Sequence, residues 1–128
     1  MALVLRAAIT LGGLLLIFIG FGFLTDPVTA GAGFGLSAEG AHGLTSMRAD
    51  FTSFFMVSGA SLIWGAIARR RDPLIIGALL MLVTLAVRLV ALAIDGSFEG
   101  YITPMIVEIV IGALGLMGAK VLPEKAKS

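Results

Sequence analysis

Four stretches of the chain are almost continuously apolar, and short polar or turn-forming segments separate them. The apolar stretches cover residues 2–24, 46–68, 74–94 and 101–121. A helix needs about 20 mostly apolar residues to cross a bilayer, because each residue adds about 1.5 Å. The first stretch is longer than the apolar core of a signal peptide, so we expect it to remain as a span. The pattern predicts an all-α membrane protein, a bundle of four transmembrane helices in one domain over residues 1–128.

Composition supports this prediction and excludes several classes of function. Hydrophobic residues make up 59% of the chain and charged residues 13%, and the mean hydropathy is +1.08. A soluble domain has about 25% charged residues, so a water-exposed fold is excluded. The net charge of +1 provides no basic face for nucleic acid. The chain has no cysteine and one histidine, His42, so we expect no metal site and no cofactor.

The positions of the basic residues predict how the spans are oriented. Seven cations fall on one side of a four-span arrangement: Arg6, Arg69, Arg70, Arg71, Lys120, Lys125 and Lys127. Among the charges near the opposite ends of the spans, Arg48 is the only cation. Because cytoplasmic connections carry an excess of Lys and Arg, we expect both termini inside (N-in/C-in) in a bacterial inner (cytoplasmic) membrane.

The connection between the first two spans is long and rich in glycine. It covers residues 25–45 and begins with Asp26-Pro27, a combination typical of a helix N-cap followed by the first helical residue. Val28, Phe34 and Leu36 are apolar. We therefore expect a short interfacial segment with some local order on the outer surface, rather than a phosphate-binding glycine loop, because no β-strand precedes these glycines.

Five ionisable residues lie in or at the ends of the spans, where a charge needs a partner or water. They are Arg48, Asp50, Arg88, Asp95 and Glu108. Arg88 lies roughly 22 Å from the inner end of the third span, and Glu108 roughly 10 Å from the outer end of the fourth. All five therefore converge on the outer half of the membrane. We expect Arg88 to pair with Glu108 at depth, and Arg48 to pair with Asp95 nearer the surface.

Two interpretations of these five charges compete. They form either a buried polar network that fixes the arrangement of the helices, or a polar pocket that opens toward the outer face. Gly112 and Gly115 share a face with Glu108, and small residues mark close helix contacts in membranes. A pocket requires at least two of the five charges to border one concavity between the second, third and fourth spans.

The same residues carry a resemblance to a known family. The segment 43–51 (GLTSMRADF), Arg88 with Asp95-Gly96, and Glu108 resemble the bacterial domain-of-unknown-function family 4345 over nearly the whole chain. That family is similar to the wider DoxX-like group of small four-helix membrane proteins. The resemblance implies the four-helix fold and the importance of the five charges, and it implies no activity.

Several functions remain for such a chain. A small cation exporter is excluded because the first span has no acidic residue, and we expect no enzyme because no catalytic set is recognisable. The glycines near residues 12–22 and 112–118 offer more close-contact faces than one bundle needs. We therefore expect an accessory or scaffold subunit, with a membrane-protein partner or a second copy of the chain. The alternative is a binder of a lipid, quinone or other apolar molecule in an outer-half pocket.

Overall fold

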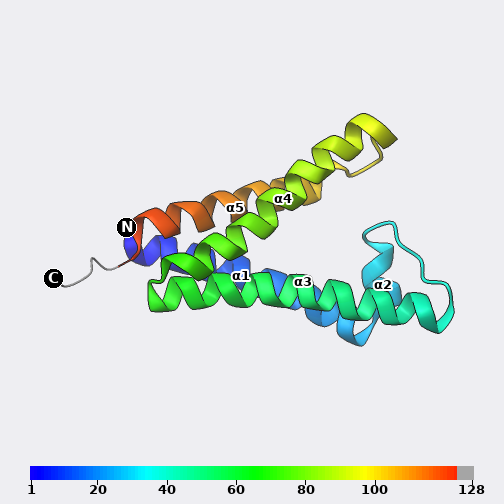
Figure 1. Ribbon diagram of the computed structural model, residues 1–128, viewed down its shortest axis with the longest axis horizontal. Helices are drawn as coiled ribbons and strands as arrows, with labels where there is room; N and C mark the ends of the chain where they lie inside the picture. Colours follow the sequence, from blue (N-terminus) through cyan, green and yellow to red (C-terminus); the bar gives the residue numbers. More distant parts are fainter. Residues whose placement is uncertain (124–128) are drawn as a thin grey trace.

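The computed structural model describes residues 1–123, which form five α-helices and no β-strand (Figure 1). The helices are α1 (Ala2–Thr25), α2 (Pro27–Ala32), α3 (Gly40–Ala68), α4 (Arg71–Asp95) and α5 (Ile102–Val121). All except α2 are long and apolar enough to cross a membrane. The predicted fold class, an all-α bundle with four such helices, is confirmed.

Two of the long helices begin earlier than the apolar pattern predicts. α3 begins at Gly40 rather than at residue 46, and α4 begins at Arg71 rather than at residue 74. Apolar runs mark only the part of a helix that fits the hydrocarbon core. The extra residues are mostly polar or small, and Asp72 and Pro73 suit a first helical turn.

The four long helices run alternately up and down, so the bundle has two chemically different ends (Figure 1). The start of α1, the connection between α3 and α4, and the end of α5 lie at one end. We call it the cationic end, and its basic residues are Arg6, Arg69, Arg70, Arg71 and Lys120. The other, the loop end, holds segment 26–39 and the connection 96–101. Lys125 and Lys127, expected with the other cations, lie outside the described residues.

Two arginines at the cationic end bind backbone carbonyl groups at helix ends. The Nε and Nη2 atoms of Arg6 donate to the carbonyl oxygens of Ala66 and Ile67, at 2.9 and 3.0 Å. The Nε atom of Arg69 donates to the carbonyl oxygen of Leu122 at 2.8 Å. The last carbonyls of a helix have no partner within the helix, so these bonds satisfy them and join α1 to α3 and α3 to the end of α5.

α1 and α3 approach closely because glycines face each other. A Cβ atom on Gly13 would lie 2.7 Å from the carbonyl oxygen of Gly59, and one on Gly59 would lie 2.5 Å from that of Gly13. A Cβ on Gly20 would lie 2.8 Å from Cγ of Met56. Real Cβ atoms do not approach other atoms this closely, so only glycine permits the observed distance between the two helices.

Most of the glycines that predicted a spare contact surface lie at close contacts between helices of this chain. A Cβ on Gly12 would lie 3.2 Å from Ile111, and one on Gly118 would lie 2.5 Å from Ile9. Cβ atoms on Gly112 and Gly115 would lie within 3 Å of α4 side chains. Of the α1 glycines, Gly22 has the most space, with only Ala30 Cβ within 4 Å, at 3.8 Å. The prediction of surplus glycine faces is therefore wrong for Gly12, Gly13, Gly20, Gly112, Gly115 and Gly118.

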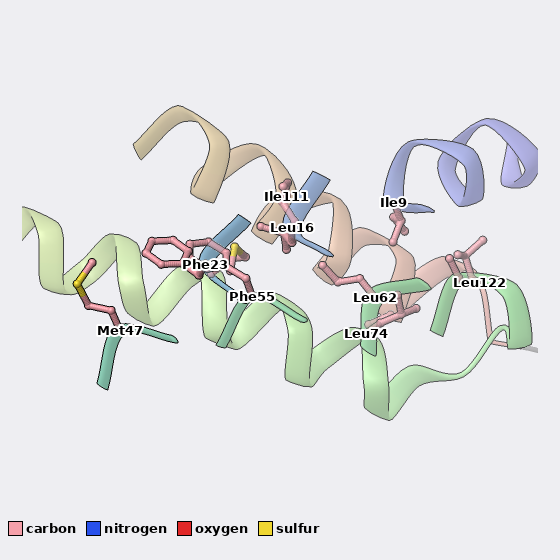
Figure 2. Packing of buried hydrophobic residues seen from close by; sticks show 12 residues of the cluster. Ile9, Leu16, Phe23, Met47, Phe55, Leu62, Leu74, Ile111 and Leu122 are labelled. Carbon is pink, nitrogen blue, oxygen red and sulfur yellow. The ribbon is translucent and has the colours of Figure 1, made fainter. Parts of the chain in front are cut away.

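The hydrophobic core runs along the bundle and changes character between its ends (Figure 2). Ile9, Leu62, Leu74 and Leu122 are almost completely buried near the cationic end. Toward the loop end, aromatic rings replace these aliphatic side chains. The ring of Phe23 stacks on Phe51 and Phe55, with centroids 4.8 and 5.8 Å apart.

The segment between α1 and α3 is ordered, as expected, and it packs at the loop end beside these aromatic rings. Asp26 accepts a hydrogen bond from the backbone N–H of Thr29 at 3.2 Å, so it caps α2, and Pro27 is the first residue of that helix. The ring of Phe34 lies 5.5 Å from that of Phe23. The segment therefore packs on α1 and α3 through Phe34.

The α4–α5 hairpin diverges from α1 and α3 toward the loop end (Figure 1). All buried residues of α4 lie between Pro73 and Met81, and none follows Met81. The last turns of α4 therefore have α5 and the connection 96–101 as their neighbours. This divergence decides which of the predicted charged residues meet.

Candidate functional site

Arg88 and Glu108 form an ion pair between α4 and α5, as predicted. The Nε–H group of Arg88 donates to both carboxylate oxygens of Glu108, with distances of 2.9 Å to Oε1 and 2.7 Å to Oε2. α4 and α5 are antiparallel and joined by a short connection, so residues similarly far from that connection lie at the same height. Arg88 lies seven residues before the end of α4 and Glu108 six residues after the start of α5.

The ion pair is held where the two helices pack closely. One turn after Glu108, a Cβ on Gly112 would lie 2.7 Å from the Leu82 side chain, so α4 covers this glycine directly. The Glu108 side chain is only 8% exposed, whereas that of Arg88 is 28% exposed. A charge in an apolar environment is costly unless it is paired. The Glu108 carboxylate therefore needs the Arg88 guanidinium as its partner, while part of the Arg88 side chain remains exposed.

The open side of Arg88 borders a cavity of about 220 Å³. The cavity lies between the last two turns of α4 and the connection to α5, and it is lined by Arg88, Ala91, Leu92, Asp95, Gly96, Ser97, Phe98 and Tyr101. Two of the five predicted residues, Arg88 and Asp95, thus border one concavity. α3 does not line it, so its position between the second, third and fourth spans was predicted wrongly. Glu108 lies behind Arg88 and is not a lining residue.

Two glycines and two aromatic rings shape the rim of this cavity. Gly96 ends α4 with φ of +88°, and Gly100 precedes α5 with φ of +82°, values that side chains with a Cβ rarely adopt. These glycines let the connection turn back over α4. The rings of Phe98 and Tyr101 contact each other edge to face, with centroids 6.3 Å apart. The rim therefore presents an aromatic surface beside the polar groups.

Arg48 does not pair with Asp95, so this prediction is wrong. Arg48 instead donates a hydrogen bond from Nη1 to the carbonyl oxygen of Leu24, near the end of α1. It lies on the α3 face that contacts α1, whereas Asp95 ends a helix that diverges from α3 at this level. Asp50 and Asp95 are both exposed, and neither forms an ion pair within residues 1–123.

Arg48 also acts on the carboxylate that caps α2. The pKa of Asp26 lies below its ordinary value because Thr29 binds the ionised form, first through its side chain and then through its backbone N–H, and because the Arg48 charge is near. The Asp26 carboxylate, the Arg48 guanidinium and the backbone carbonyl of Leu24 thus form a small group of polar atoms at the junction of α1, α2 and α3. This group has a structural role, separate from the cavity beside Arg88.

Sequence reasoning missed two aromatic residues of the site and one feature away from it. Only charged residues were predicted as site residues, whereas the aromatic residues Phe98 and Tyr101 also line the cavity. Gly96 and Gly100, on either side of residues 97–99, are the sequence signal that could have indicated a shaped turn there. Away from the cavity, sequence reasoning also missed Thr52 in α3, whose Oγ1 atom is buried and has no hydrogen-bond partner within residues 1–123. Nothing in the pattern distinguishes this threonine from the hydroxyl of Thr84, which bonds the carbonyl of Leu80 in its own helix.

Comparison with known proteins adds the family. The profile of one family, described as a domain of unknown function (DUF4345), matches residues 4–119. No curated protein and no solved structure matches the chain. The similarity to the DoxX-like group therefore stays a prediction. Because the match extends from the start of α1 nearly to the end of α5 and includes all five charged positions, the chain belongs to the DUF4345 family.

Proposed function

We propose that the protein binds an amphiphile of the membrane, a lipid or a quinone, in the cavity beside Arg88, and that it has no catalytic activity. The observation that supports this proposal most strongly is that the Arg88 guanidinium has unused hydrogen-bond donors. Glu108 accepts its Nε–H, and neither Nη group has a hydrogen-bond partner within residues 1–123. Four N–H bonds therefore remain to bind a headgroup at the border of a cavity with an apolar rim.

The charges around the cavity indicate which headgroup fits. Arg88 brings one positive charge, while Glu108 and Asp95 bring two negative charges when ionised. A strongly anionic headgroup would meet repulsion from Asp95. A neutral carbonyl oxygen or a zwitterionic headgroup can accept hydrogen bonds from Arg88 without this cost. The expected ligand is therefore uncharged or zwitterionic, and it carries at least one acceptor oxygen.

The size of the cavity supports a site that encloses only part of the ligand. Sites that enclose a whole small molecule measure about 300–1,000 Å³, and this cavity is smaller, at about 220 Å³. It has room for a ring or a headgroup, while an apolar tail would extend along α4 into the lipid. Leu92, Phe98 and Tyr101 supply the apolar surface at the point where the tail would leave.

The role of an accessory or scaffold subunit ranks second. Its sequence argument rested on spare glycine faces, and these glycines contact other helices of the same chain. A membrane-protein partner bound in stoichiometric amount, with no small molecule in the preparation, would favour this role over ligand binding.

We further propose that the protein lies in the inner membrane of a bacterium with both termini in the cytoplasm. The cations gathered at one end of the bundle support this orientation. The chain has no cysteine, so single cysteines test it without background. In intact cells, an impermeant thiol reagent should label Ser97→Cys at the loop end but not Ala68→Cys at the cationic end. The reverse labelling would contradict the orientation.

Ligand binding is tested by a matched pair of phenylalanine variants. Phe98 lines the cavity, and Phe18 is exposed on α1 away from it. Each protein is purified in mild detergent, and the amphiphiles extracted from it are quantified by mass spectrometry. We expect one species in near-stoichiometric amount from the native protein and from Phe18→Ala, and several-fold less from Phe98→Ala. Equal amounts from both variants would contradict binding at this cavity.

A further inference from the structure

A second concave site lies at the cationic end of the α4–α5 hairpin. It is a groove of about 480 Å³, lined by Arg71, Ile75, Leu116, Ala119, Lys120 and Pro123. Arg71 is the first residue of α4, and Lys120 lies in the last turn of α5. The two cations therefore face one groove from two antiparallel helices, at the level where both helices reach their ends.

The two cations of the groove are not used to stabilise the fold. Arg6 and Arg69 bind backbone carbonyls at the same end of the bundle. Arg71 and Lys120, by contrast, are exposed and make no side-chain hydrogen bond or ion pair within residues 1–123. None of the lining residues is acidic. Within residues 1–123, the groove thus combines two available positive charges with no acidic lining residue.

The remaining lining residues are apolar and continue along the hairpin. Ile75 lies one turn beyond Arg71 in α4, and Leu116 one turn before Lys120 in α5. In a membrane-spanning hairpin, the helix ends reach the level of the lipid headgroups, and the next turn enters the level of the acyl chains. The groove therefore matches a molecule with an anionic head and an apolar tail, in this order along the membrane normal.

We propose that this groove binds an anionic phospholipid, with Arg71 and Lys120 on either side of its phosphate group and an acyl chain against Ile75 and Leu116. Basic grooves between membrane helices are suited to such headgroups, because each Lys or Arg near the headgroup level adds attraction for negative charge. A free phosphate ion would use the cations but would gain nothing from the apolar walls. The site is independent of the cavity beside Arg88, which has the opposite charge balance.

The test compares two arginines that are neighbours in sequence. Arg70 and Arg71 are both exposed, but only Arg71 lines the groove. The full chain is prepared in neutral detergent as the native protein, Arg71→Gln, Lys120→Gln and the control Arg70→Gln. Titration with phosphatidylglycerol or phosphatidylcholine, followed by native mass spectrometry, measures the affinity for each lipid.

We expect the native protein to prefer phosphatidylglycerol. Each of Arg71→Gln and Lys120→Gln should lower its affinity about fivefold, the effect of one cation near the headgroup level, and Arg70→Gln should lower it by less than twofold. Circular dichroism and gel filtration establish that each variant keeps its helices and its size. An equal loss in Arg70→Gln and Arg71→Gln would indicate diffuse attraction by the whole basic end and would overturn the proposal.

A second arm separates a lipid site from a phosphate site. Soluble glycerol phosphate carries the anionic head without acyl chains, so it should compete with phosphatidylglycerol only at concentrations far above that of the lipid. Competition at equal concentration would overturn the assignment to a lipid. Extraction results at the Phe98 cavity do not bear on this outcome, because no residue lines both sites.

Discussion

Replacing Arg88 and Glu108 singly and together measures how much their ion pair stabilises the α4–α5 hairpin. Arg88→Met leaves a carboxylate that is 8% exposed without its partner, and Glu108→Leu leaves a guanidinium that is 28% exposed. Removing one member of a buried ion pair typically costs about 3–5 kcal/mol, whereas apolar replacement of both is often nearly neutral. The pair here is only partly buried, so we expect losses at or below the lower end of that range.

The exposures also predict an unequal cost. After Glu108→Leu, the long arginine side chain can turn its charge toward water through its open side. After Arg88→Met, the short glutamate side chain behind α4 has no such route. We therefore expect Arg88→Met to cost about 3 kcal/mol and Glu108→Leu about 2 kcal/mol, while the double variant loses about 1 kcal/mol or less.

The assay is equilibrium unfolding in mixed micelles, with the helix content followed by circular dichroism as the denaturing detergent is increased. The four proteins form a double-mutant cycle, whose coupling should be about 4–5 kcal/mol from the values above. Losses that simply add in the double variant would refute the reasoning, because they would mean that neither side chain depends on the other. A larger loss for Glu108→Leu than for Arg88→Met would refute the argument from exposure.

Two further predictions concern α1 and the cap of α2. Gly13→Ala should cost about 1–3 kcal/mol, because its Cβ would lie 2.6 Å from Ile63, while Gly22→Ala, with 3.8 Å of space, should be neutral or stabilising by up to about 1 kcal/mol in the same assay. Equal losses would contradict the close approach of α1 and α3. The Thr29 amide resonance should titrate with the pKa of Asp26, at a midpoint below the ordinary value of an aspartate. Because the pKa of Asp26 is lowered in the folded protein, the cap stabilises α2 fully above the ordinary aspartate pKa and loses this effect as the pH falls through the lowered pKa. A midpoint above the ordinary value would contradict the cap.

The sequence indicated how deep each residue of a span lies along the membrane normal. It did not indicate which neighbouring helix each side chain faces. The Arg88–Glu108 pair could be predicted because a short connection between antiparallel spans places both residues at one height. The partner of Arg48 could not, because the spans are apolar on all sides and no polar face indicates which side meets which neighbour. A backbone carbonyl such as that of Leu24 is also available on every helix, so no residue type marks it as a partner.

The divergence of the hairpin was equally invisible in the pattern. The sequence of an apolar stretch does not show whether a neighbouring helix or lipid covers it, since both are apolar. The half of α4 that follows Met81 and the buried half before it therefore look alike in sequence. The cavity beside Arg88 arises from this divergence and from the turn between Gly96 and Gly100, and only the turn had a sequence signal.

Arg88 is proposed to bind the headgroup of an uncharged or zwitterionic amphiphile. The most direct measurement is native mass spectrometry of the native protein and of the double variant Arg88→Met, Glu108→Leu, which should keep the fold while losing the guanidinium. If Arg88 binds the headgroup, we expect one lipid or quinone molecule per chain in the native protein and none above background in the double variant. An equal amount of the same molecule in both proteins would contradict it.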